Sequence, residues 1–358
     1  MLSNFRKKLF CYISLQNSKP LLYSAFSGTI FLKQNHYWRG KFMKKYRIGV
    51  DIGGTNIKIA LVDMDGKIVY SNTTPTRADM GYEHTLGNIK LAISDLMKES
   101  NQNKNTIEAI GFGFPGQIDY QAGVVRLLPN MPGWVDIPVA DIMQKEFGIV
   151  TKLDNDVRVA TLGELKYGAG KGCQNLVCIT VGTGIGSGLV INGKLARGAK
   201  NAAGEIGHIK MSMGDGPLCG CGDFACFEAY ASGPAIVQMA KEYIMGGKSS
   251  KFKELATEEL SPYIVAQAAL QGDVVARQIY RKIGETIGLG LTSVINLLNP
   301  EKVIIGGGVA DAGDILFNPI REVVQKRAMP IQASSVEIVH AELGNTAGVI
   351  GASLLIES

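Results

Sequence analysis

Short apolar runs alternate with longer amphipathic stretches from about residue 46 to the end of the chain. Runs with strand character occur at Tyr46–Val50, Ile57–Val62, Lys67–Ser71, Ile107–Phe112, Val124–Leu128, Ile149–Leu153, Leu176–Val181 and Lys302–Ile305. Helical patterns cover Gly81–Ser100, Asp156–Tyr167, about Asp273–Leu298 and about Thr346–Glu357. Asp65-Gly66 and Asn192-Gly193 are dipeptides typical of tight hairpin turns. Hairpins mixed with strand–helix units predict an α/β fold with mixed sheets.

Length and charge narrow the possibilities further. A chain of 358 residues is too long for one small core, so two domains are expected. The net charge of +5 comes from residues 1–42, which carry seven basic side chains and no acidic ones, leaving −2 for residues 43–358. We therefore expect no large surface for nucleic acid. No apolar run approaches the ~20 residues that cross a bilayer, so no membrane partner is expected.

The first 42 residues show no clear helical or strand period. They are basic and contain serine, as transit peptides do, but they lack a clear apolar core followed by a cleavage site. Met43-Lys44-Lys45-Tyr46 resembles a translation start just before the first strand. We expect residues 1–42 to be a disordered leader or the product of a misassigned start.

One glycine-rich stretch formally matches a dinucleotide-binding motif. Gly111, Gly113 and Gly116 follow a strand with the spacing of that motif. The motif requires a helix next, because the pyrophosphate binds at the N-terminus of that helix. Pro115 and the strand-like run Val124–Leu128 follow instead, so the sequence argues against a dinucleotide fold.

Two other glycine turns suit phosphate binding, and a third, Gly306–Gly308 after the strand Lys302–Ile305, is either a plain strand-ending turn or a place where a planar ligand can approach the backbone closely. The turns at Asp51–Thr55 and Gly182–Gly188 each lie between two strands, where consecutive backbone N–H groups can surround an anion. Neither turn contains the Gly-Lys-Ser/Thr of a P-loop, and each alone is as compatible with a plain hairpin. Together they favour a nucleotide with Mg²⁺, which Asp51 can hold through water. The expected nucleotide and Mg²⁺ residues are Asp51, Gly53, Gly54, Thr55, Lys58, Gly182, Thr183, Gly184, Gly306, Gly307 and Gly308.

A crowded set of cysteines predicts a metal site. Cys219, Cys221 and Cys226 follow His208 within 18 residues, whereas the other three of the six cysteines stand alone. Three thiolates and one imidazole complete a tetrahedral zinc shell and leave no position for a catalytic water. We expect a structural zinc ion. The reduced thiolates indicate the cytoplasm.

Several polar residues suit acid–base and sugar chemistry. Asn155-Asp156 lies between a strand and a helix, where an aspartate is usually a helix cap. A sugar hydroxyl is a weak nucleophile, and a carboxylate at a strand end can accept its proton. Glu205 and Glu228 flank the cysteine segment, and carboxylates accept strong hydrogen bonds from sugar hydroxyls.

These motifs together resemble the ROK family (repressors, open reading frames, kinases), and within it the bacterial glucokinases. The resemblance rests on Asp51-Ile-Gly-Gly-Thr-Asn-Ile-Lys58, on Asn155-Asp156, on Glu205-x-Gly-His208 and on the cysteine motif up to Glu228, and it covers residues 43–358. It implies the actin-like ATPase fold, two domains that close over a cleft, and a homodimer. We place residues 43–153 with 344–358 in a smaller domain and residues 154–343 in a larger domain that carries the zinc loop.

The resemblance also implies an activity and residue roles. It implies that ATP with Mg²⁺ phosphorylates a hexose, expected to be glucose, at the 6-hydroxyl. Asp156 would be the base, and Asn155, Glu205, His208 and Glu228 would bind the sugar. His208, Cys219, Cys221 and Cys226 would bind zinc.

Two departures and several alternatives stay open at this point. Ala225 stands where the family usually has glycine, and Arg158 stands where asparagine is common. Another hexose or an N-acetylhexosamine is an alternative substrate, and polyphosphate is an alternative donor. A sugar-responsive repressor or a sugar sensor without activity is the alternative to an enzyme.

Overall fold

The computed structural model describes residues 45–247 and 260–358. The prediction for residues 1–42 lies outside these ranges. Within them, no helix combines the length and the apolar character that a bilayer crossing needs.

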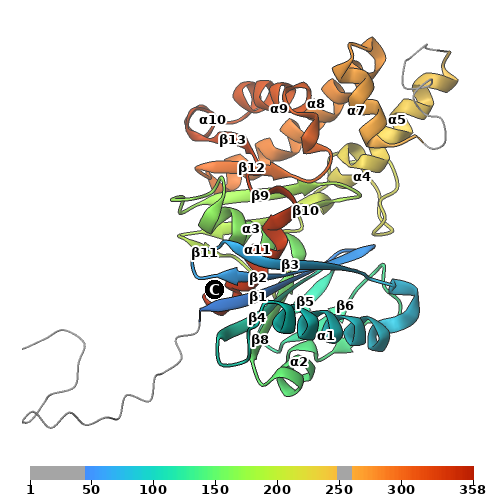
Figure 1. The fold of residues 1–358 in the computed structure, drawn as a ribbon. Helices are drawn as coiled ribbons and strands as arrows, with labels where there is room; N and C mark the ends of the chain where they lie inside the picture. Colours follow the sequence, from blue (N-terminus) through green and yellow to red (C-terminus); the bar gives the residue numbers. More distant parts are fainter. Residues whose placement is uncertain (1–44, 248–259) are drawn as a thin grey trace, which may run out of the picture. The chain divides into compact units, whose positions relative to one another are not determined.

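The first sheet has five strands in the order β3-β2-β1-β4-β8 (Figure 1). Strands β1, β2 and β3 form antiparallel pairs, and β4 and β8 continue the sheet in parallel with β1. Their bounds are Tyr46–Ile52 (β1), Asn56–Asp63 (β2), Ile68–Pro75 (β3), Ile107–Phe114 (β4) and Val150–Asn155 (β8). Apolar side chains of this sheet pack with those of α1 (Gly81–Glu99) and α2 (Val139–Phe147) in one buried core.

The second sheet repeats this layout in the order β11-β10-β9-β12-β13. A hairpin of β9 and β10 is again extended by parallel strands on the side of the first hairpin strand. The bounds are Leu176–Val181 (β9), Ile185–Ile191 (β10), Lys194–Leu195 (β11), Lys302–Gly306 (β12) and Glu337–His340 (β13). The glycine turns Asp51–Thr55 and Gly182–Gly188 therefore lie at equivalent hairpins of the two sheets, β1–β2 and β9–β10.

Helices cover the second sheet on the side away from the first sheet (Figure 1). They are α4 (Phe227–Ala231), α5 (Gly233–Met245), α7 (Pro262–Leu270), α8 (Val274–Leu298), α9 (Asp314–Arg327) and α10 (Pro330–Ser335). A small antiparallel sheet consists of β5 (Gln117–Asp119), β6 (Val124–Leu127) and β7 (Val135–Ile137). Short 3-10 turns are η1 (Ala78–Met80), η2 (Ile206–His208), η3 (Ala310–Ala312), η4 (Gly344–Thr346) and η5 (Leu354–Ile356).

The elements predicted from the sequence are present. The strand after Gly116 is β5, so the motif of the dinucleotide folds lacks its helix here, as expected. Asn192 and Gly193 both have positive φ and form the turn between β10 and β11. The last predicted helix is shorter than expected: α11 covers only Ala347–Ser353, and η4 and η5 flank it.

Helices α3 (Asp156–Tyr167) and α11 lie between the two sheets and pack closely on each other. Glycines make this approach possible. A Cβ on Gly49 of β1 or on Gly111 of β4 would overlap carbonyl groups of α11, and a Cβ on Gly351 of α11 would overlap the carbonyl of Val159 in α3. Since backbone cannot yield as a flexible side chain does, no larger residue fits at these positions.

Gly351→Ala is therefore expected to destabilise the protein by about 3 kcal/mol or more, because the added methyl group has no space. Gly87 in α1 is the matched control, since an added Cβ there meets no atom within 4 Å. Gly87→Ala is expected to stabilise by about 0.5–1 kcal/mol. Urea unfolding measures both, and equal midpoints for Gly351→Ala and the wild type would contradict the packing.

Candidate active site

The first phosphate turn joins β1 to β2. Gly53, Gly54 and Thr55 are exposed at its tip, and Thr76 fixes the turn by donating a hydrogen bond from Oγ1 to the Gly53 carbonyl (2.7 Å). Asp51 at the end of β1 faces Lys58 in the β1–β2 ladder. A Cβ on Gly348 of α11 would lie 2.5 Å from the Asp51 carboxyl carbon, so the helix begins directly against this carboxylate.

The second and third glycine turns are neighbours. The N–H of Gly182 donates to the Gly184 carbonyl (2.9 Å), and the N–H of Gly233 donates to the Gly182 carbonyl (2.7 Å). Gly307 has φ +86°, and a Cβ there would lie 2.8 Å from the carbonyl carbon of Val181, the residue before Gly182. Gly182 and Gly308 have open space where a side chain would be. The structure thus brings Gly182–Gly184 and Gly306–Gly308 to the same end of the second sheet.

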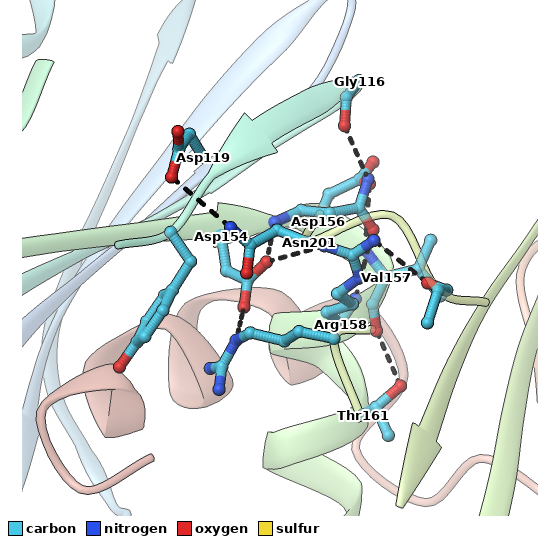
Figure 2. Close-up of polar contacts among 12 residues, drawn as sticks. Gly116, Asp119, Asp154, Asp156, Val157, Arg158, Thr161 and Asn201 are labelled. Carbon is cyan, nitrogen blue, oxygen red and sulfur yellow. Dashed lines mark hydrogen bonds and ion pairs between the residues drawn. The ribbon is translucent and has the colours of Figure 1, made fainter. Parts of the chain in front are cut away.

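Asp156 is the first residue of α3, directly after β8 (Figure 2). The helix begins here because the Asn155 side chain caps it, accepting hydrogen bonds from the N–H groups of Val157 (3.0 Å) and Arg158 (3.3 Å). The Asn155 amide also donates to the Gly116 carbonyl (3.3 Å). The cap is therefore Asn155, and the Asp156 carboxylate is not needed for that task.

Asp51 and Asp156 lie on either side of Gly113 of β4. A Cβ on Gly113 would lie 3.4 Å from the Asp156 Cα and 3.8 Å from the Asp51 Oδ1. Burial, and after it the negative charge of Asp51, together raise the pKa of Asp156 to about 7, against the lowering effect of the Val157 N–H. Burial also raises the pKa of Asp51, which Lys58 partly offsets. A carboxyl group with a pKa near neutrality is suited to accept a proton.

Ile185, the first residue of β10, contacts Glu228 and the segment that carries Glu205 and His208. Its N–H donates to Glu228 Oε2 (2.8 Å), and Gly207 packs on its carbonyl closely enough to exclude any Cβ. Beside it, a Cβ on Gly186 would lie 2.6 Å from a methyl group of Val157. The first residues of β10 therefore contact four features of the site: the start of α3, the second glycine turn, Glu228 and the His208 segment.

The side chains predicted to bind a sugar differ in exposure. Glu205 and His208 are exposed at the two ends of η2. Glu228 is half-buried because it is held by the backbone of Ile185. The Glu205 carboxylate is thus accessible to a ligand, whereas Glu228 already has a backbone partner and His208 faces the Cys219 sulfur through Nδ1.

The four predicted metal ligands come together. One ligand atom from each of His208, Cys219, Cys221 and Cys226 lies within 4.8 Å of the others. Cys221 and Cys226 have their sulfurs 3.7 Å apart, and the Cys219 sulfur is 3.8 Å from His208 Nδ1. Tetrahedral zinc with Zn–S bonds of about 2.3 Å places sulfurs roughly 3.8 Å apart. The donor set and its spacing fit a zinc ion.

Ala225, one of the two departures, has a conformation that favours glycine. Its φ is +58°, in the left-handed region. A residue with a side chain costs about 1–2 kcal/mol there. The loop that carries Cys219, Cys221 and Cys226 therefore has local strain directly before Cys226.

Sequence reasoning missed the residues that support the site rather than line it. Asp154 is fully buried beside Asn155 and pairs with Arg158 and Arg197, as Figure 2 shows for Asp154 and Arg158. Asp154 directly follows the predicted strand Ile149–Leu153, and no role was predicted for it from the sequence. A charged residue next to a predicted base was the available signal.

Three comparisons place the chain among known proteins. A model of the ROK family matches residues 47–358. The glucokinase of Thermotoga maritima is 37% identical over 312 residues, which are 87% of this chain and 96% of that protein. A ROK family glucokinase from Streptomyces griseus, solved with glucose and AMPPNP, is 34% identical with a TM-score of 0.75, over 87% of this chain and 98% of that one.

Regulators are also related. The xylose repressor of Caldicellulosiruptor bescii is 30% identical over 87% of this chain and 78% of its own length. The fold is the actin-like ATPase fold of the sugar kinases, as the resemblance implied. The family match and these relatives together show that the chain belongs to the ROK family.

Proposed function

We propose that this protein transfers the terminal phosphoryl group of ATP to the 6-hydroxyl of glucose, which gives glucose 6-phosphate and ADP. The observation that carries the proposal is the carboxyl group of Asp156 at the start of α3, whose pKa is raised to about 7 and which lies beside Gly113, close to Asp51 at the first glycine turn. The related glucokinases, each matched over most of its length, support the same activity.

In the proposed reaction, Asp156 accepts the proton of the 6-hydroxyl while that oxygen bonds to the terminal phosphorus. The bond between this phosphorus and the bridging oxygen breaks, and its electron pair leaves with ADP. Asn155, Glu205, His208 and Glu228 hold the sugar through its other hydroxyls. A pKa near neutrality lets Asp156 be ionised before transfer and still hold the proton afterwards.

ATP would lie on the glycine turns. Backbone N–H groups of residues 53–55, 182–184 and 306–308 would donate to the phosphate oxygens of ATP or lie close to its adenine ring. Asp51 and Lys58 would hold the Mg²⁺ that accompanies ATP and the phosphates, respectively. Bound Mg²⁺ supplies positive charge that offsets the charge of the phosphate oxygens.

We place residues 43–153 with 344–358 in one domain and 154–343 in the other, and we propose that they close around sugar and ATP. Closure would exclude water and so limit hydrolysis of ATP. The proposal also includes a homodimer, as the family resemblance implies. It further includes a cytoplasmic location, where thiolates stay reduced.

A structural zinc ion would hold the loop that carries the sugar residues. His208, with Nδ1 directed to the cysteines, would offer Nε2 to the sugar. The Cys219 sulfur lies 3.5 Å from Glu228 Oε1, so the zinc site and this glutamate are direct neighbours. Zinc would therefore fix both side chains.

A panel of glucose, mannose, fructose, N-acetylglucosamine and N-acetylmannosamine, assayed for ADP release with ATP and with polyphosphate, tests the substrate. Glucose with ATP is expected to have the highest kcat/KM. A higher value for another sugar or donor would replace glucose or ATP in the proposal. Sugar binding without turnover would indicate a sensor, and operator DNA binding in a gel-shift would indicate a repressor.

Asp156→Asn is expected to lower kcat by about 10²–10⁴, because an amide cannot accept the proton. Glucose affinity, measured by calorimetry without ATP, should change by less than about threefold, since an amide still hydrogen-bonds. Asp95→Asn, on the exposed face of α1, is the control and should retain the wild-type rate. Turnover in Asp156→Asn near the wild-type rate would remove Asp156 from the mechanism.

The pH profile follows from the raised pKa. Asp156 is protonated below about pH 7, and a protonated carboxyl cannot act as the base. We expect kcat/KM for glucose to fall about tenfold per pH unit on the acidic side and to level off on the alkaline side. A flat profile from pH 5.5 to 8 would contradict the assignment.

Cys219→Ala is expected to lose bound zinc, measured by plasma mass spectrometry, and to raise the KM for glucose by loosening His208 and Glu228. Cys173→Ala is the matched control, because Cys173 is also buried but is not part of the cluster. The zinc content of this variant should stay at one ion per chain. Full zinc content in Cys219→Ala would refute the ligand assignment.

A further inference from the structure

A buried carboxylate next to the base binds two arginines. Asp154 is 0% exposed, and the side chains of Arg158 and Arg197 are 5% and 15% exposed. Asp154 Oδ1 accepts from Arg158 (3.2 Å) and from the Asn155 N–H (2.8 Å), and Oδ2 accepts from Arg197 (2.7 Å). Both carboxylate oxygens are thus used by partners with fixed positions, as a buried charge requires.

The two arginines come from different parts of the chain. Arg158 lies on α3, two residues after Asp156, and Arg197 lies just after β11. The Arg197 guanidinium stacks on the Tyr120 ring at 3.7 Å, which fixes its plane. Asp154 therefore links the start of α3 to the segment between β11 and η2 through these two arginines.

Arg158 also bonds directly to that segment, which we call the sugar loop (residues 196–205). Its second terminal nitrogen donates to the Ala203 carbonyl (3.0 Å), two residues before Glu205. Within the loop, the Ala203 N–H donates to the Arg197 carbonyl (3.0 Å). The same guanidinium thus contacts Asp154, at the end of the strand before the base, and the loop that carries Glu205.

Two further contacts hold the sugar loop in the same place. Asn201 donates to Asp119 of β5 (3.4 Å), as Figure 2 shows. Ser187 of β10 donates to the Gly204 carbonyl, directly before Glu205. The loop is therefore attached near both its middle and its end, and Arg158 is the attachment that leads to the base.

We propose that Arg158 is a positioning residue for sugar binding, which sets the sugar loop and Glu205 relative to Asp156 through Asp154 and the Ala203 carbonyl. This inference rests on the proposed function. It also gives a role to the departure at position 158, where the family resemblance leads one to expect asparagine. The planar guanidinium bonds the Asp154 carboxylate and the Ala203 carbonyl from two different terminal nitrogens, whereas a lysine would have to reach both from a single nitrogen.

Arg158→Met keeps much of the side-chain length and removes the donors. We expect the KM for glucose to rise about tenfold, the KM for ATP to change less than twofold and kcat less than threefold. Arg158→Lys should be intermediate, because it keeps the charge beside Asp154 and loses the fork. Arg281→Met, which removes an exposed arginine of α8, is the control and should leave all three constants unchanged.

Hydrogen exchange of the protein without substrate provides a second readout. Peptides covering residues 196–205 should exchange about tenfold faster in Arg158→Met, while peptides of α8 stay unchanged. This measurement needs no turnover. A wild type that phosphorylates no hexose would overturn the proposed function, and the loop exchange would still report on positioning.

The proposal is overturned if folded Arg158→Met has a glucose KM within twofold of the wild type, or if the KM values for glucose and ATP rise together. It is also overturned if exchange of the sugar loop does not change. If Arg158→Met does not fold, Arg158→Lys and Asn201→Ala decide by the same measurements, since each weakens one attachment of the loop.

Discussion

The burial of Asp51 and Asp156 close together beside Gly113 is the constraint on which the site depends. Both carboxylates lose water on burial, and the charge of Asp51 adds to the cost of ionising Asp156. A carboxylate in water would have a pKa near 4 and would be a weak base. Here the pKa is about 7, so one aspartate can take a proton while the other, facing Lys58, stays available to a cation.

The fold creates this pair by bringing backbones unusually close. Helix α11 packs on Gly49 of β1 and on Gly111 of β4, and its own Gly348 lies against Asp51. Helix α3, which begins with Asp156, packs directly on α11 because Gly351 leaves space for the Val159 carbonyl. These contacts desolvate both carboxylates without placing a side chain between them.

The sequence predicted what depends on local pattern and failed where long-range packing decides. The range of α3, both glycine hairpins and the His208–Cys226 cluster follow from periodicity, turn chemistry and ligand spacing, and the structure contains all of them. The partner of Arg158 could not be predicted, because Ala203 is 45 residues away and presents only a backbone carbonyl. The position of Gly348 against Asp51 joins residues almost 300 apart. The left-handed conformation of Ala225 was also missed, although the glycine usual at this position in the family was a signal for it.

The most direct test is to titrate the Asp156 carboxyl group by carbon-13 NMR in the protein without substrates, with the resonance assigned by its loss in an Asp156→Asn variant. The account predicts a pKa of about 7 in the wild type and a lower value in Asp51→Asn, where the neighbouring charge is removed. A wild-type pKa near 4, or a value that Asp51→Asn leaves unchanged, would contradict the account.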